Sequence, residues 1–139
     1  MTGVQTCALP IYPAPSARRF ETGTPPVPNL FMARPALQLL MNVGMENVAA
    51  QIAGLARAFQ SGARELGIAS KTPPDSCGPL VVLLAKDSTA IVERLATHGI
   101  MVSARHDGVR CAFHVYNTLD DVGAALDALK QNLDLMVRC

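Results

Sequence analysis

The 139-residue sequence has little of what proteins that bind nucleic acids or membranes need. Its formal net charge is +1, charged residues make up 17%, and aromatic residues only 4%, with no tryptophan. The chain therefore offers neither a strongly basic surface for phosphate backbones nor aromatic platforms for bases, and nucleic acid is not an expected partner. No apolar run approaches the ~20 residues that cross a bilayer, so no membrane association is expected.

Cysteine is sparse and scattered. The four cysteines, at positions 7, 77, 111 and 139, include no CxxC pair and no Cys/His cluster at zinc-ligand spacing. We therefore expect no metal site and no disulfide framework, which favours the reducing cytoplasm as the location of the protein. Half of the residues are hydrophobic, a composition typical of an ordinary globular domain.

Residues 1–11 differ in character from the rest of the chain. They lack the positive segment and the long apolar core of a signal peptide. Residues 3–11 instead resemble the conceptual translation of a sequencing adapter joined to a truncated gene. We expect residues 1–11 to be a non-native leader and the native sequence to begin near Tyr12, inside a longer protein.

Apolar spacing and turn residues predict seven elements in the order helix, helix, strand, helix, strand, strand, helix. We expect helices over 29–43 and 46–66, after position 87 or 88, and after Thr118, and strands over 80–84, 100–104 and 109–115. Asn29 is the expected cap of the first helix, and Pro35 should kink that helix or shift its start. Thr118 and Asp121 should form a capping box.

This order predicts an α+β fold, with helices packed on one face of a small, mainly antiparallel sheet. The apolar residues of the first helix have no evident partner within so small a layer. We therefore expect that helix to expose an apolar face.

The strand predicted over 109–115 carries a lone arginine. Because side chains alternate faces along a strand, Val109, Cys111 and Phe113 should share an apolar face and Arg110 should lie on the opposite one. A guanidinium group binds a carboxylate bidentately, which suits an amino-acid ligand. The strand by itself leaves open whether Arg110 has this role or is a solvated or structurally paired arginine.

The run Gly23-Thr24-Pro25 is the second candidate site. Its small residue, its hydroxyl and its free backbone N–H groups suit a phosphate oxygen. Taken alone, however, these residues favour an ordinary proline-terminated turn.

These two runs, in this order, resemble the C-terminal part of class V aminotransferase-fold enzymes, which are fold type I enzymes that use pyridoxal 5'-phosphate. The matching residues are RFETGTPP at 19–26, and Arg110 followed six residues later by Tyr116-Asn117-Thr118. The resemblance implies that Arg110 binds the α-carboxylate of an amino-acid substrate. It also implies that Thr24, with Gly23, contacts the cofactor phosphate of the neighbouring subunit in a homodimer.

The resemblance has further implications for the organisation of the chain. Residues 12–44 would be the tail end of the large cofactor-binding domain and 45–139 the C-terminal small domain. The Schiff-base lysine would lie upstream, so the fragment alone would be inactive, and Lys86, which follows a strand, is not at the position of that lysine. Apart from the resemblance, Arg105 ends the second predicted strand near Arg110. It is a second expected substrate contact for a distal acid group, and an ordinary surface arginine is the alternative interpretation.

Three kinds of function stay open. The first is an aminotransferase-, lyase- or epimerase-like enzyme of this superfamily, acting on an amino acid. The second is a member like the cysteine desulfurases and selenocysteine lyases, which the sequence disfavours because residues 99–109 contain no cysteine and Cys111 should point away from Arg110. The third is a non-catalytic, small-molecule-binding regulatory module.

Overall fold

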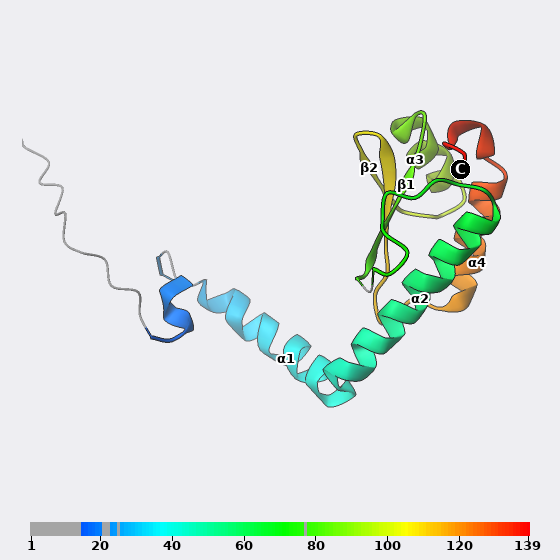
Figure 1. Cartoon of the computed structure of the whole chain (residues 1–139). Coiled ribbons are helices and arrows are strands. Elements are labelled where there is room, and N and C mark those ends of the chain that lie inside the picture. The colour runs from blue at the N-terminus through cyan, green and yellow to red at the C-terminus, as the bar shows by residue number, and fades with distance from the viewer. Residues whose placement is uncertain (1–14, 21–22, 25, 77) are drawn as a thin grey trace, which may run out of the picture. The chain divides into compact units, whose positions relative to one another are not determined.

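The computed structural model describes residues 15–20, 23–24, 26–76 and 78–139. The chain forms two compact units, Met1–Leu39 and Leu40–Cys139, and each is described by itself. The leader predicted over residues 1–11 lies outside the described residues. The predicted domain boundary after residue 44 stays a prediction. Figure 1 shows the elements in chain order.

The first elements are a short 3-10 turn, η1 (Ala17–Phe20), and the helix α1 (Val27–Val43). α1 begins earlier than expected, and the prediction that Asn29 caps it is wrong. Asn29 lies inside the first turn, where its N–H donates to the Pro26 carbonyl at 2.9 Å. Pro35 lies within the helix, which continues past it to Val43.

Helix α2 (Met45–Glu65) forms as its apolar spacing predicts, within one residue at each end. Its buried residues include Val48, Leu55 and Phe59, which form one stripe. Gly67 follows the helix with a φ of 71°, the left-handed conformation that ends helices and that glycine adopts without steric cost.

The sheet has three antiparallel strands in the order β1-β3-β2. They are β1 (Leu80–Leu84), β2 (Ser103–Arg105) and β3 (Gly108–Ala112). His106 and Asp107 form the two-residue turn between β2 and β3, and His106 has a φ of 33°. This turn joins β2 and β3 into a hairpin.

Strands β2 and β3 are shorter than the sequence predicts. The N–H of Ile100 bonds to the Leu95 carbonyl, so this residue belongs to the turn that ends the preceding helix. After β3, the N–H of His114 donates to the Asn117 side chain at 2.9 Å, which turns the chain toward the last helix. Local hydrogen bonds therefore replace sheet pairing at both places.

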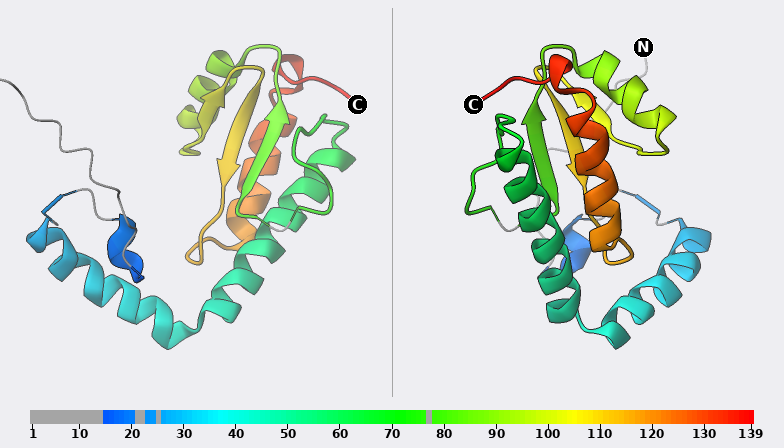
Figure 2. Two further views of the ribbon diagram at one scale, coloured as in Figure 1. Left: turned by 60° about the vertical axis from the view of Figure 1, so that its left-hand side comes forward. Right: turned by 90° about the vertical axis from the view of Figure 1, so that its right-hand side faces the viewer.

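The remaining helices are α3 (Ser88–Thr97) and α4 (Leu119–Lys130), followed by the 3-10 turn η2 (Leu133–Leu135). Asp87 caps α3, because its carboxylate accepts from the N–H groups of Thr89 and Ala90. Helices α2, α3 and α4 cover one face of the sheet and leave the other face bare of helices (Figure 2). The predicted α+β fold is confirmed.

The core lies between the sheet and these helices. Alternation along β1 buries Val81 and Leu83, while the remaining residues of the strand are exposed or half-buried. Only one face of the strand is therefore covered, although its continuous apolar run is typical of a strand buried on both faces. The largest fully buried side chains are Phe59, Ile68, Leu83, Ile91, Leu95, Leu129, Met136, Val81 and Val109.

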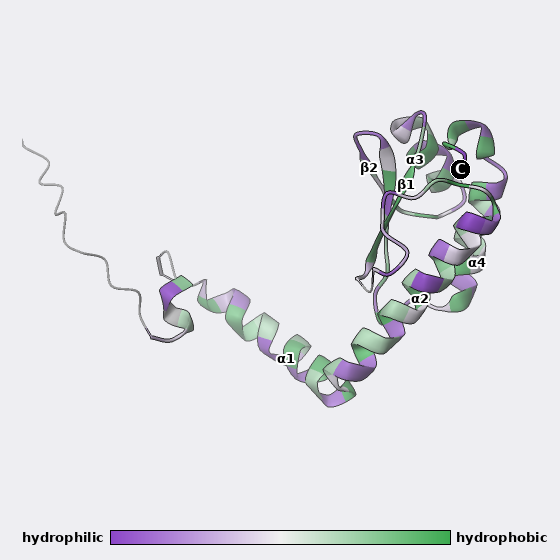
Figure 3. Cartoon of the chain, viewed as in Figure 1, coloured by the Kyte–Doolittle hydropathy of each residue, from purple (hydrophilic) through white to green (hydrophobic). Residues whose placement is uncertain are grey.

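Helix α1 buries none of its residues. Hydrophobic residues occur along much of its length (Figure 3). The large exposed hydrophobic residues of this helix are Val27, Leu30, Phe31, Met32, Leu37, Leu39, Met41 and Val43. Within the described part of the chain, no helix combines the length and the apolar character that a membrane crossing requires.

Candidate functional site

The central strand of the sheet positions Arg110. In β3 this residue pairs with Val82 of β1 on one side and with Ser103 of β2 on the other. Because the strand is paired on both edges, the face of the sheet on which the Arg110 side chain projects is fixed. Arg110 therefore lies on the face of the sheet opposite the one that α2, α3 and α4 cover.

The opposite face of the same strand belongs to the core, as the sequence predicts. Val109, Cys111 and Phe113 are all buried, and the Phe113 ring lies 5.3 Å from that of Phe59 on α2. Burial raises the pKa of the Cys111 thiol to about 12. The thiol is thus protonated near neutral pH and points away from the Arg110 face.

The Arg110 side chain is half-buried, and its Nε is buried without a hydrogen-bond partner. Among the described residues, no acidic group forms an ion pair with this guanidinium. A buried donor without an acceptor costs free energy, which a ligand carboxylate would recover by accepting from it. The prediction that Arg110 is a ligand-binding residue thus gains a structural reason.

Arg105 shares this face. Its strand register places it beside Gly108, two residues along from the pair formed by Ser103 and Arg110. Its side chain is exposed, and its Nη1 donates to the Ala104 carbonyl at 2.7 Å. The β2–β3 pairing thus brings the two predicted substrate-binding arginines to neighbouring positions.

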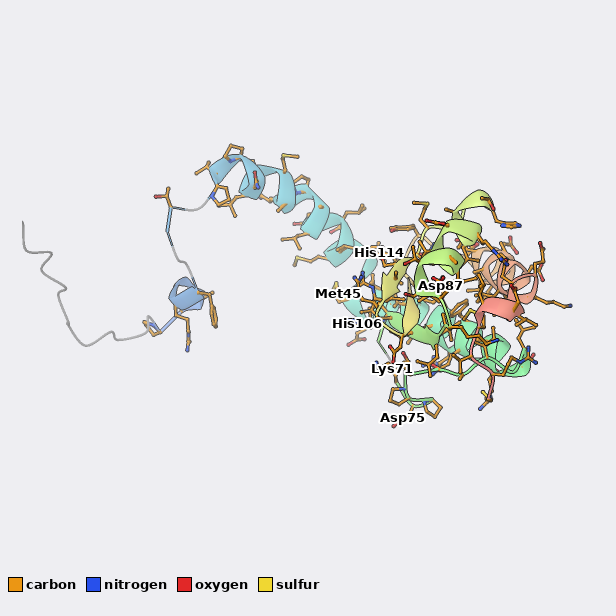
Figure 4. All side chains as sticks on the ribbon, turned by 90° about the horizontal axis from the view of Figure 1, so that it is seen from above. Met45, Lys71, Asp75, Asp87, His106 and His114 are labelled. Carbon is orange, nitrogen blue, oxygen red and sulfur yellow. The ribbon has the colours of Figure 1, made fainter. Side chains whose placement is uncertain are left out.

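The loop after β3 holds an aromatic pair that the sequence did not predict. The rings of His114 and Tyr116 stack with centroids 4.6 Å apart and an interplanar angle of 26°, and both side chains are exposed. His114 is labelled in Figure 4. Two aromatic residues separated by one position carry no signal for stacking, because the turn geometry decides whether their rings meet.

Gly23 and Thr24, the predicted cofactor-phosphate contacts, are exposed residues of the first unit. A Cβ built on Gly23 would meet no atom within 4 Å. The open space and the exposed hydroxyl fit a phosphate group, which requires close approach to the backbone. Because the two units are described separately, these residues and Arg110 are not placed relative to one another.

The chain has three lysines, at positions 71, 86 and 130. Lys71 forms an ion pair with Asp107 at 3.1 Å, and Lys86 donates to the Asp134 carbonyl at 2.9 Å. Lys130 is exposed in the last turn of α4. Lys86 is thus held in a structural hydrogen bond, in keeping with the prediction that it is not the cofactor lysine.

The clefts of the second unit include three that Arg110 does not line. One of about 350 Å³ lies along the end of α2, lined by Arg57, Gln60 and Arg64 among others. A second of about 390 Å³ includes Phe59, Cys111 and Phe113. The third lies between α2 and the start of α4. Over the described residues, no group of three or more His, Cys, Asp or Glu side chains could hold a metal ion.

The α+β unit has the fold of a part of the fold type I pyridoxal-phosphate enzymes. The chain belongs to the aminotransferase class-V family, whose model matches residues 9–126. The match covers both motifs noted in the sequence, and it confirms the resemblance on which their interpretation rests.

Individual relatives agree with this assignment. The chain is 26% identical over 114 residues to "Uncharacterized aminotransferase YcbU" of Bacillus subtilis (strain 168), which covers 81% of this chain and 31% of that protein. A cysteine desulfurase from Thermococcus onnurineus NA1 superposes with a TM-score of 0.74 at 22% identity, covering 85% of this chain and 34% of the other. The cysteine desulfurase CsdA of Escherichia coli gives a TM-score of 0.71 at 24% identity, covering 84% and 33%.

The chain thus spans about a third of the length of the relatives that it matches. At these identities, the two solved structures show the fold alone.

Proposed function

We propose that this chain supplies the substrate-carboxylate arginine, Arg110, to a pyridoxal-phosphate enzyme that acts on an amino acid. The observation that carries the proposal is the guanidinium on the open face of the sheet, whose buried Nε has no partner. A substrate α-carboxylate would accept from it and from the neighbouring nitrogens of the fork.

Thr24 and Gly23 would hold the phosphate of the cofactor, across the subunit interface of a homodimer. When bound, pyridoxal phosphate supplies an electron sink for charge that develops at the α-carbon of the substrate. The Schiff-base lysine would belong to the two-thirds of the relatives' length that this chain does not span, so the chain alone would be inactive. We place the enzyme in the cytoplasm, in keeping with the free thiol of Cys111.

Arg110 would act mainly in binding. By gripping the α-carboxylate, it would set which bond of the α-carbon lies perpendicular to the cofactor ring, and so which bond breaks. An aminotransferase, a lyase and an epimerase all need this orientation, and the choice among them depends on residues outside this chain.

The experiment is an Arg110→Ala substitution in the full-length enzyme that contains this chain. We expect kcat/KM to fall by the equivalent of about 2–5 kcal/mol, mostly through a higher KM, because a charged group of the substrate loses its partner. Arg57→Ala, which removes an exposed arginine of α2, should leave kcat/KM within about twofold, the range of an ordinary surface substitution. An unchanged kcat/KM in the Arg110 variant would rule out the proposed role.

Cysteine desulfurase activity is the second candidate, since two of the solved structures bear that name. Cys111 does not support it as the source of a nucleophilic thiolate. The thiol is buried on the core face, and burial raises its pKa to about 12. Formation of alanine from L-cysteine by the full-length enzyme, with sulfide released when a thiol reductant is added and both abolished by Cys111→Ser, would favour this second candidate.

A further inference from the structure

The face of the sheet that carries Arg110 is divided into an aliphatic side and a cationic side. The strand register places on this face the β1 residues Leu80, Val82 and Leu84. On the side of β2, the same register places Ser103 opposite Arg110 and Arg105 opposite Gly108. The polar groups of the face are therefore gathered on β2 and β3.

Arg105 and Arg110 are diagonal neighbours across the β2–β3 pair. Side chains at such positions start about 7–8 Å apart, within reach of one another for long side chains. Gly108 lies between Arg105 and β1 and is itself buried. A Cβ at this position would come within 2.5 Å of the Leu83 carbonyl oxygen, so the backbone packing itself excludes a larger residue.

The structure leaves the charge of Arg105 without an acidic partner among the described residues. The nearest acid in the sequence, Asp107 of the hairpin turn, is instead bound by Lys71, whose Nζ lies 3.1 Å and 3.2 Å from its two carboxylate oxygens. The hydrogen bond from Arg105 to the Ala104 carbonyl engages a neutral acceptor. Two like charges at neighbouring positions of a sheet face repel unless an anion lies between or beside them.

We propose that Arg105 binds the side-chain carboxylate of the substrate while Arg110 binds its α-carboxylate, so that the substrate is a dicarboxylic amino acid. The inference rests on the proposed function of Arg110 and adds the chemical class of the substrate. Ser103, opposite Arg110, offers a hydroxyl donor on the same side of the face. The aliphatic residues of β1 would pack against the methylene groups that join the two carboxylates.

The test compares acidic substrates with their uncharged analogues in the full-length enzyme. We expect higher kcat/KM for L-glutamate or L-aspartate than for L-glutamine, L-asparagine or L-alanine. Arg105→Gln should lower kcat/KM for the acidic substrate about 10- to 100-fold, mainly through KM, and change the value for L-alanine by less than about threefold. Arg57→Gln is the matched control and should change neither.

A second measurement keeps the inference independent of turnover. Titration calorimetry with glutarate and with butyrate should show tighter binding of the dicarboxylate, and Arg105→Gln should remove that difference. Equal binding of the two probes, or an equal loss for acidic and neutral substrates in the Arg105 variant, would overturn the inference. If Arg110→Ala leaves kcat/KM unchanged, the proposed function fails, and the probe titration still decides whether the two arginines bind a dicarboxylate.

Discussion

Arg110 and Cys111 are adjacent in the chain, but their side chains lie on opposite faces of the sheet and differ in burial. The pleat of β3 places the guanidinium on the open face and the thiol in the core, where only 5% of the Cys111 residue surface is exposed. The desolvated thiol resists ionisation, so its pKa rises to about 12. The residue therefore behaves as a small apolar side chain.

This pKa predicts how the stability of the protein depends on pH. The thiol ionises near pH 9 in the unfolded chain and near pH 12 in the folded one, so folding is favoured by the protonated form. The contribution of the protonated thiol to the free energy of unfolding is therefore complete below pH 9. As the pH rises from 9 toward 12, this contribution is lost by up to about 1.4 kcal/mol per pH unit.

Urea titrations of the wild-type protein and of Cys111→Ala at pH 8 and pH 10 measure this effect. The loss of unfolding free energy between the two pH values should be smaller in the variant. At pH 8, iodoacetamide should also modify the exposed Cys139 well before Cys111. Equal rates at these two cysteines would contradict the buried position of Cys111.

At the scale of the element, the start of α4 shows what the polar residues Asn117, Thr118 and Asp121 do. The Thr118 hydroxyl accepts from the Asp121 N–H at 3.3 Å, and the Asp121 carboxylate accepts from the Thr118 N–H at 2.8 Å. The amide of Asn117 also donates to that carboxylate at 3.2 Å. The backbone hydrogen bond from Thr118, followed by the one from Asn117, lowers the pKa of Asp121. The predicted capping box is confirmed.

Removing the cap should destabilise the fold without touching its core. We expect Thr118→Ala to lower the unfolding free energy by about 1 kcal/mol, whereas Thr118→Ser keeps the hydroxyl and should stay close to the wild type. The Asp121 carboxylate contributes to the free energy of unfolding at pH values above the pKa of this group in the unfolded chain. This contribution is lost as the pH falls through the lower pKa of the folded state. Chemical denaturation of the wild type and both variants at neutral pH measures how much the cap contributes to the free energy of unfolding.

Over the whole molecule, the exposed apolar residues of α1 distinguish the chain from a self-sufficient globular protein. Phe31 and Met32 are 73% and 75% exposed, and no residue of the helix is buried. Contiguous apolar surface of this kind is typical of a surface that another polypeptide covers.

We therefore expect the 139-residue chain to be poorly soluble or self-associated. Replacing Phe31 and Leu37 by Gln should shift it toward a monodisperse monomer, because both side chains are exposed apolar residues of α1. Arg34→Gln, a change on the same helix that removes no apolar surface, should leave the association unchanged. Size-exclusion chromatography with light scattering measures the mass, and a soluble wild-type monomer would contradict the expectation.

Several elements were predictable because their determinants are local. The 3.6-residue apolar spacing of α2, the glycines after its end and after α1, and the caps of α3 and α4 act within a few residues of the chain. The strand ends and the start of α1 were predicted wrongly because hydrogen bonds of other kinds competed there, as with the Asn29 N–H in the first turn of α1. Propensity alone does not resolve such competition.

The amino-acid sequence by itself determined the α+β order, the two motifs and the opposite faces of Arg110 and Cys111, because helical spacing and strand alternation follow from backbone geometry alone. The sequence also placed Arg105 close to Arg110, because the strands that carry them are joined by a short turn. Only the tertiary structure decided that the Arg110 Nε is buried without a partner and that Lys71 forms an ion pair with Asp107. Burial and pairing arise from residues far apart in the chain, which no local pattern encodes.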